Sequence, residues 1–394
     1  MNPIQGQMKD GFLHAALSGR IDTESAPECE RQLQALCAQY AGAPLELDAA
    51  QLSYISSAGL RVLLRIRKSK PEMRIVNVAP EVYEIFEMTG FTEMMEIRKA
   101  FRSMSVEGCE ILGEGSNGVV YRYNPELVVK VYRNPNALDD IRKERDLARK
   151  ALVLGIPTAI SFDVVKVGDR YASVFELLNA KSFTKLIKAE PEKLDTYVKL
   201  YVDLLRQIHA TEVSPDDMPD MKATALRWTE FLKGHLDDAI QEKLCALIRA
   251  VPDRHTMIHG DFHTSNVEMQ NGEVLLIDMD TLSYGHPIFD LASMYLAYRA
   301  FGELDHSITG RFLKLPYELA GQIFDRSLQM YLNTDDPQRL RAVMQKAEII
   351  AHTRLLRRTI RRDAETEFGK RQIAWCRQKL AELVPACDSL AFEI

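Results

Sequence analysis

The sequence predicts a chain of the α+β / α/β class with a small sheet-and-helix domain at residues 1–100 and a two-lobed domain at residues 101–394. Three observations support this prediction. Strand-like and helix-like segments alternate over the first hundred residues. Residues of about 105–179 are rich in strand-like sequence, with one helical stretch, and residues of about 180–394 are mostly helical. We therefore expect a β-rich lobe and an α-rich lobe on either side of a cleft.

Several segments justify the first domain. We expect strands at Leu13–Ile21, Pro44–Leu47, Met73–Val78 and Met95–Arg98. Ser25, followed by Pro27 and Glu28, has the composition of a helix start, with serine as the cap and proline in the first turn. A second helix is expected to begin at Ser56, and a third to span Pro80–Met88. Such an order of strands and helices predicts a sheet covered by helices.

Composition excludes several functional classes. The chain has 394 residues, with 50 Lys and Arg against 56 Asp and Glu, and a formal net charge of −6. This balance argues against nucleic acid as a partner, because nucleic-acid binding needs a basic surface. No apolar run reaches the roughly 18 residues of a membrane span, so no membrane partner is expected. The six cysteines form no C-x-x-C pair and indicate reduced thiols in a cytoplasmic protein.

A glycine-rich stretch opens the second domain. Residues 113–120 read G-x-G-x-x-G-x-V, and glycines at this spacing let a backbone approach phosphates, although a plain hairpin turn would look similar. The next strand-like run, Leu127–Val131, carries Lys130 in its apolar interior. A lysine in a strand usually lies on a solvated edge, but one placed after a glycine loop can reach phosphates. Glu144, on the following amphipathic helix, would pair with Lys130 or with neighbouring arginines of its own helix.

A polar loop between short apolar strands carries the strongest chemical signal. Asp261 and Asn266 lie in the loop His259–Asn266, and Asp278 follows the apolar run Val274–Ile277. Phosphoryl transfer needs one carboxylate to position the attacking hydroxyl, and an amide oxygen with a second carboxylate to hold Mg²⁺. Oxygen ligands suit Mg²⁺ rather than zinc. A set of ordinary surface turns would have to produce these residue types in this order by accident.

Residues of about 105–394 resemble the protein-kinase-like fold, and within it the aminoglycoside phosphotransferase and choline kinase branch. The resemblance rests on the H-G-D-x-x-x-x-N loop, on Ile277–Asp280 and on Gly285–Ala292. It implies ATP and Mg²⁺ as cofactors, Asp261 as the catalytic base, Asn266 and Asp278 as metal ligands, and Lys130 as a phosphate clamp paired with Glu144. The segment after Asp280 leaves no room for a long activation loop, which disfavours an ordinary protein kinase.

The same resemblance implies further roles. The backbone around Phe175–Leu178 would meet the adenine ring, Asp280 would assist the metal or the substrate, and Asp290 would anchor the helical lobe. His259 and His263 would be structural. The remaining cofactor-binding residues are Gly113, Gly115, Ser116, Asn117, Gly118, Val119, Val128, Glu176 and Leu178.

Residues of about 8–100 resemble STAS domains, the anti-sigma-factor antagonist family. Tyr54–Leu64 is similar to the phosphoacceptor segment of that family, and Gly19–Asp22 and Met88–Phe91 also fit. The resemblance implies Ser57 as the acceptor, with Ser56 as the second candidate because it stands where the family often has Asp. A phosphate at a helix N-terminus would meet free N–H groups. The alternative is that these serines only cap the helix.

An arginine run near the C-terminus admits two interpretations. Arg354, Arg357, Arg358, Arg361 and Arg362 place several guanidinium groups on one helix face. We favour a solvated face over a site for an anionic substrate or partner, because most charge runs are solvated.

Two functions remain open. The first is an ATP- and Mg²⁺-dependent phosphotransferase that acts on a hydroxyl of a small molecule or of a protein serine, such as Ser57, with the STAS domain as a regulatory or partner-binding module. The second is a signalling adaptor whose kinase-like domain senses nucleotide and is catalytically weak.

Overall fold

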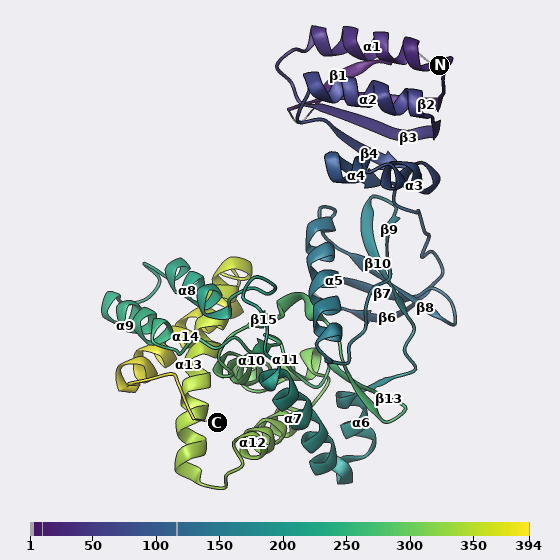
Figure 1. Ribbon diagram of the computed structural model, residues 1–394. Coiled ribbons are helices and arrows are strands. Elements are labelled where there is room, and N and C mark those ends of the chain that lie inside the picture. Colours follow the sequence, from purple (N-terminus) through teal and green to yellow (C-terminus); the bar gives the residue numbers. More distant parts are fainter. Residues whose placement is uncertain (1–3, 10, 116, 394) are drawn as a thin grey trace. The chain divides into compact units, whose positions relative to one another are not determined.

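The computed structural model describes residues 4–9, 11–115 and 117–393 (Figure 1). The chain divides into two compact units. The first unit comprises residues up to Ser105 together with Val164–Asp169, and the second comprises Val106–Asp163 and the residues from Arg170 onwards. Among the residues that the structure describes, no helix is long and apolar enough to cross a membrane.

The first unit is built on a five-stranded sheet in the order β1-β2-β3-β4-β5. Its strands are β1 (Gly6–Lys9), β2 (Phe12–Ile21), β3 (Leu45–Ile55), β4 (Arg74–Val78) and β5 (Glu96–Lys99). The β1–β2 pair is antiparallel, and the other three pairs are parallel. Parallel strands need crossover connections, and helices supply them here. These helices are α1 (Ala26–Gln39), α2 (Ser57–Ser69), α3 (Pro80–Met88) and the single turn α4 (Phe91–Met94).

Strand β3 is longer than the sequence predicted. The expected strand ended near Asp48, but β3 continues to Ile55. The adjacent residues Ala50 and Gln51 are both exposed and interrupt the alternation of buried and exposed side chains. The pairing of β2 with β3 also shifts register between Ala16 and Ser18. A β-bulge with polar neighbours looks like a loop in a sequence, so the second half of the strand was missed.

The second unit begins with a β-rich lobe. Its sheet has the order β6-β7-β8-β10-β9, which places β8 at the centre. The strands are β6 (Glu110–Glu114), β7 (Gly118–Arg122), β8 (Leu127–Tyr132) and β10 (Arg170–Glu176), and the helix α5 spans Leu138–Val153. The edge strand β9 (Asp163–Val167) falls in the first unit from Val164 onwards. The β6-β7-β8 and β8-β10 pairs are antiparallel. Because β8 is the central strand, neighbouring strands lie on both sides of its middle, where Lys130 is located.

The remainder of the second unit is an α-rich lobe. Its helices are α6 (Phe183–Ala189), α7 (Leu194–Ala210), α8 (Met221–Phe231), α9 (Asp238–Arg249), α10 (Ile288–Tyr298), α11 (Ser307–Phe312), α12 (Tyr317–Leu332), α13 (Pro337–Arg362) and α14 (Glu367–Ala386). Short strands connect them: β11 (Lys181–Ser182), β12 (Met257–Ile258), β13 (Val267–Gln270), β14 (Glu273–Leu276) and β15 (Ser283–Tyr284). The mixed fold class and the β-rich and α-rich lobes predicted from the sequence are therefore confirmed.

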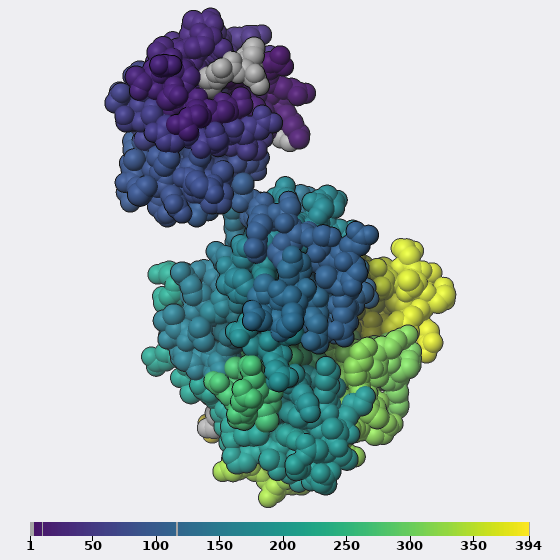
Figure 2. All heavy atoms as spheres, turned by 90° about the vertical axis from the view of Figure 1, so that its right-hand side faces the viewer, coloured from purple at the N-terminus to yellow at the C-terminus, as the bar shows by residue number. Residues whose placement is uncertain are grey.

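Helix α10 forms the centre of the α-rich lobe. All of its residues are buried, as expected for a helix that is apolar on every side. Helices α12 and α13 pack against it, and α14 packs against α13. Part of α14 and the C-terminal segment, in yellow, lie at the surface of this unit (Figure 2). The central helix thus provides a rigid base for the polar loop that precedes it.

Candidate active site

The glycine-rich hairpin between β6 and β7 closes through a hydrogen bond from Gly115 N to Gly118 O (2.9 Å). Glycine is required at position 118, because an added Cβ atom would lie 2.4 Å from the carbonyl oxygen of Val131 on β8. Near the tip of the hairpin, Asn117 Nδ2 donates a hydrogen bond to Asp280 Oδ2 (2.9 Å). The glycine loop therefore reaches an acidic side chain of the α-rich lobe.

The other predicted nucleotide contacts of this region lie around the hairpin. An added Cβ atom at Gly113 would meet nothing within 4 Å, so a ligand has room to approach the backbone there. Val119 on β7 and Val128 on β8 are both half-buried. Ser116, also predicted to bind the cofactor, lies outside the described residues.

Lys130 lies between two carboxylates, of which the sequence suggested only Glu144 as a partner. Its Nζ atom is 3.0 Å from Glu144 Oε1 on α5 and 3.3 Å from Asp278 Oδ1, and its side chain is only 15% exposed. Burial by itself lowers the pKa of Lys130, but the charges of Asp278 and Glu144 outweigh burial and raise it, so the amine stays protonated. Tyr132 OH donates to the second oxygen of Glu144 (2.8 Å) and fixes that carboxylate.

Asp290 holds the backbone of the polar loop that carries Asp261. The amide groups of His259 and Gly260 donate to its two carboxylate oxygens, at 2.8 Å and 2.6 Å. His209 Nε2 lies 3.0 Å from the same carboxylate, which is fully buried on α10. Gly260 has a φ of 80° and lies close to Thr281 O, which explains the glycine at this position. These contacts fit the anchoring role expected of Asp290.

Asp261 has two basic side chains near its carboxylate. His263 Nε2 is 3.6 Å from Oδ2, and Arg354 on α13 is 3.8 Å from Oδ1. Burial raises the pKa of Asp261, but the close contact and charge of His263 and the charge of Arg354 lower it by more than burial raises it, so the net direction is downwards. The carboxylate is therefore ionised at neutral pH and able to accept a hydrogen bond from a hydroxyl.

Hydrogen bonds to the backbone link the two predicted metal ligands, Asn266 and Asp278, through the polar loop. Asn266 Nδ2 donates to Asp261 O (3.0 Å), and Ile277 N donates to Asn266 O (2.9 Å), which places Asn266 beside the residue that precedes Asp278. Asp278 adopts the left-handed conformation, with a φ of 63°. Backbone strain of this kind in a non-glycine residue is often found at functional sites.

The carboxylates near Lys130 fit a divalent cation. Burial, followed by the charges of Asp278 and Glu144, raises the pKa of Asp280 to about 7. Burial is the largest cause of this shift, and repulsion from the two neighbouring carboxylates adds to it. Carboxylate and amide oxygens are the ligands that Mg²⁺ prefers, and a cation among them would relieve the repulsion.

The segment predicted to meet the adenine ring follows β10. Glu176 is the last residue of the strand and pairs with Leu127, and Leu177 N donates to Glu126 O (2.6 Å). Leu178 comes next and is half-buried. Neither Glu176 nor Leu178 has a described side-chain contact with the catalytic loop, so their assignment stays a prediction.

The candidate phosphoacceptors lie at the N-terminus of α2 in the first unit. Ser56 is the cap residue, and its hydroxyl accepts a hydrogen bond from Gly59 N (3.4 Å). Ser57 is the first helical residue and is exposed. Gly59 is tightly enclosed, because an added Cβ atom would lie 2.6 Å from Ile21. The two serines therefore differ: one caps the helix, and the other is accessible.

Sequence reasoning missed the role of Arg354. Its guanidinium group donates to Gly260 O (2.6 Å) in addition to lying near Asp261. The signal was present in the arginine run at residues 354–362, but the sequence did not show that α13 returns to the catalytic loop. The contact between Asn117 and Asp280 was likewise not predicted, since 163 residues separate the two.

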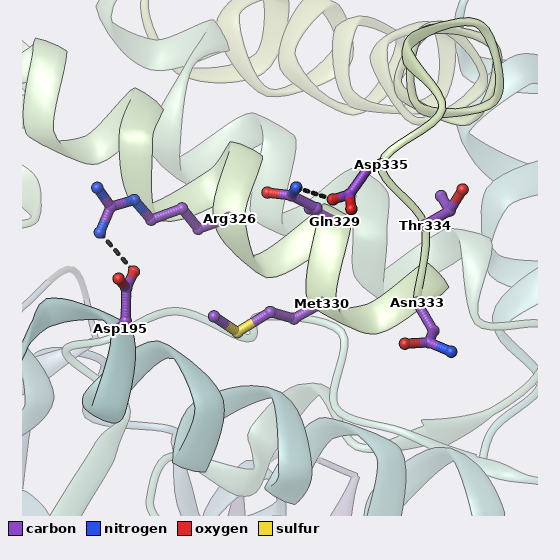
Figure 3. A pocket seen from close by; sticks show the side chains of 7 residues that line it. All are labelled: Asp195, Arg326, Gln329, Met330, Asn333, Thr334 and Asp335. Carbon is purple, nitrogen blue, oxygen red and sulfur yellow. Dashed lines mark hydrogen bonds and ion pairs between the residues drawn. The ribbon is translucent and has the colours of Figure 1, made fainter.

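A separate depression lies between α7 and α12 (Figure 3). Its polar side chains pair with one another: Arg326 lies against Asp195, and Gln329 donates to Asp335. None of the predicted site residues lines it. This depression is therefore not the candidate active site.

Comparisons with known proteins assign both parts of the chain. The model of the phosphotransferase enzyme family matches residues 108–342, and the model of the STAS domain matches residues 4–104. A candidate anti-sigma factor antagonist of Bordetella bronchiseptica, BtrV, is 35% identical over 92 residues, which cover 22% of this chain and 78% of that protein. An anti-sigma-B factor antagonist of Listeria monocytogenes is 26% identical over 93 residues, which cover 23% of this chain and 81% of that protein.

Solved structures of aminoglycoside phosphotransferases resemble the chain. The ADP-bound structure of APH(2'')-Ib is 16% identical, with 76% of this chain and 98% of that chain covered and a TM-score of 0.49. The gentamicin complex of APH(2'')-IIa is 15% identical, with coverages of 78% and 97% and a TM-score of 0.47. Since the family model matches more than half of the sequence, the chain belongs to the phosphotransferase enzyme family and carries a STAS domain at its N-terminal side.

Proposed function

We propose that the chain is an ATP- and Mg²⁺-dependent phosphotransferase that acts on a hydroxyl group, with residues 101–394 as the catalytic part and residues 1–100 as a regulatory module. The observation that carries this proposal is the position of Lys130 between Glu144 and Asp278, while Asp261 and Asn266 share one loop. Positioning and charge stabilisation of this kind are the main requirements of phosphoryl transfer.

Each residue has a role in the proposed reaction. Lys130 binds phosphate oxygens of ATP, and the backbone of the glycine loop covers them. Asn266 and Asp278 would hold Mg²⁺, which supplies charge neutralisation at the phosphates. Asp261 accepts the proton of the acceptor hydroxyl while the hydroxyl oxygen forms a bond to the γ-phosphorus of ATP. The bond between that phosphorus and the bridging oxygen of the β-phosphate breaks in the same step. The products are ADP and a phosphorylated acceptor.

The acceptor is a hydroxyl of a small molecule or of a protein serine. The aminoglycosides in the structures of related proteins are small molecules of this type. If the acceptor is a serine of this chain, Ser57 is the candidate, because it is exposed at the start of α2. A phosphate there would face free backbone N–H groups and the positive end of the helix. Ser56 is less suited, since its hydroxyl already caps the helix.

The test of catalysis uses the full chain with ATP and Mg²⁺. ATP turnover and intact mass are measured for the wild type and for Asp261→Asn, which keeps the size of the side chain and removes its charge. We expect the variant to bind ATP but to lose at least about 100-fold in turnover. Equal turnover in both proteins would contradict the role of Asp261. Nucleotide binding by the wild type without turnover or mass gain would favour the signalling adaptor.

The acceptor assignment has its own test. If the wild type gains the mass of a phosphate, Ser57→Ala is expected to abolish the gain and Ser56→Ala to retain it. A gain that persists in Ser57→Ala would show that another residue is the acceptor. Peptide mapping of the wild type locates the phosphate independently.

We also propose a cytoplasmic location and a protein partner for the STAS module. All six cysteines are unpaired thiols, which suits a reducing compartment. The related anti-sigma factor antagonists indicate a partner-binding role for the STAS module.

A further inference from the structure

Helix α13 brings an arginine row to the catalytic loop. The arginine row consists of Arg354, Arg357, Arg358, Arg361 and Arg362, whose spacings of three and four residues place them on neighbouring turns. Arg354 marks its catalytic end: it donates to Gly260 O (2.6 Å) and lies 3.8 Å from Asp261 Oδ1. The row therefore starts at the proposed base.

Aromatic rings hold three members of the row. Arg354 lies over Trp228 and Arg357 over Phe231, each 5.7 Å from the ring centre, and Arg358 lies over Phe301 at 5.3 Å. A ring attracts a guanidinium group but leaves its positive charge in place. The hydrogen-bonding groups of the row are thus held in position without being neutralised by these contacts.

The charges of the row repel one another. Burial, followed by the charges of Arg361 and Arg354, lowers the pKa of Arg357, and burial followed by Arg362 does the same for Arg358. The carboxylates described in contact with the row are Asp261, at 3.8 Å from Arg354, and Asp363, at 4.0 Å from Arg358. Asp261 is the proposed catalytic base, so its negative charge also acts on the acceptor hydroxyl and does not serve only to neutralise the arginine row.

We propose that the arginine row binds an anionic group of the acceptor, so that the substrate is a small hydroxylated phosphate or carboxylate. This inference rests on the proposed function and names its substrate class. On a helix, Arg354 and Arg358 are about 6 Å apart along the axis, a separation that one small molecule can bridge. Its hydroxyl would lie at Asp261 and its anion at Arg358, which lies four residues after Arg354 on the same helix face. A polyamine, such as an aminoglycoside, would be repelled.

The test uses inorganic phosphate as the probe for the anion site. Phosphate is titrated into the full chain in the presence of saturating AMP-PNP and Mg²⁺, which occupy the proposed nucleotide site, and binding is measured by calorimetry. The double variant Arg357→Gln/Arg358→Gln is compared with the wild type. Its matched control is Arg339→Gln/Arg341→Gln, which removes two charges near the start of the same helix.

We expect the Arg357→Gln/Arg358→Gln variant to bind phosphate at least about tenfold more weakly than the wild type, because charge-assisted hydrogen bonds are lost. The control is expected to bind it as the wild type does. Absence of phosphate binding by the wild type, or equal affinity in all three proteins, would overturn the proposal. The AMP-PNP affinity of each variant shows in the same experiment that the protein is folded.

A second measurement compares two acceptors of opposite charge. ATP turnover is recorded with ribose 5-phosphate, a hydroxylated anion, and with kanamycin, a polyamine. Greater stimulation by the anion, lost in the Arg357→Gln/Arg358→Gln variant, supports the proposal, and phosphorylation of kanamycin alone overturns it. If the wild type binds AMP-PNP but does not bind phosphate, the anion site is excluded and the proposed function is unaffected. Failure of the wild type to bind AMP-PNP contradicts the proposed function itself.

Discussion

At the scale of single residues, Lys130 is the side chain that we propose to bind phosphate in the β-rich lobe. It is enclosed by the sheet and held by carboxylates at 3.0 Å and 3.3 Å, so its charge is fixed in place before a ligand arrives. We predict that Lys130→Met lowers ATP turnover by about 100-fold or more, because the methionine matches the stem but lacks the charge. Lys143→Met, on the exposed side of α5, is the control. Steady-state turnover checks this, and an unchanged rate in Lys130→Met would exclude the phosphate-binding role.

We predict that His286 makes the second unit sensitive to acid. Its Nδ1 atom accepts a hydrogen bond from Ile288 N (3.1 Å) at the start of α10, so this nitrogen must be unprotonated. Burial, followed by the charge of Arg254, lowers the pKa of His286 from 6.5 to about 4. The unfolded chain therefore binds the proton at a higher pH than the folded chain. The stabilisation is complete above pH 6.5 and is lost as the pH falls towards 4, by up to about 3 kcal/mol.

Urea unfolding of the second unit at neutral pH and near pH 4 measures this loss. His286→Asn offers an acceptor oxygen that does not titrate in this range, so we expect the free energy of unfolding of the variant to fall less on acidification. The difference between the two proteins isolates the histidine from other titrating groups. An equal decrease in both would show that His286 is not responsible.

At the scale of elements, the glycine hairpin depends on one close approach between strands. A Cβ atom at Gly118 would lie 2.4 Å from Val131 O, and Val131 directly follows Lys130 on β8. We predict that Gly118→Ala costs about 1–3 kcal/mol in unfolding free energy and weakens AMP-PNP binding, because β7 must shift. Gly113→Ala, whose Cβ atom would meet open space, should change stability much less. Thermal unfolding and calorimetry compare the two, and similar effects would refute the packing argument.

The elements also show how far a sequence predicts this molecule. Strands with regular alternation and helices with one apolar face were predicted, as at Leu13–Ile21 and Pro80–Met88, because local periodicity determines them. The short β1 was missed, since its side chains are mostly exposed and leave no periodic signal. The pairing of Lys130 with Glu144 was suggested by the sequence. The approach of Arg354 to Asp261 was not, because it depends on helix packing across a long chain separation.

At the scale of the whole molecule, the described residues form two hydrophobic cores that share no residue. One includes Phe86 of α3 and the strands of the first sheet, and the other includes Phe183 of α6 and the helices of the second unit. Stability contributed by a core belongs to the unit that buries it, and a ligand stabilises the unit to which it binds. The two units are therefore expected to respond to different perturbations.

We predict two thermal transitions in scanning calorimetry of the full chain. Phe86→Ala removes a fully buried ring and should destabilise the first unit by about 3–5 kcal/mol, leaving the second transition in place. AMP-PNP with Mg²⁺ should raise only the second transition, because the residues that we propose to bind nucleotide lie in that unit. Phe231→Ala, a partly exposed ring of the second unit, is the reciprocal control and should lower only the second transition. A single transition that moves with every perturbation would show that the STAS module and the phosphotransferase unfold together, and nucleotide binding would then stabilise the regulatory module as well.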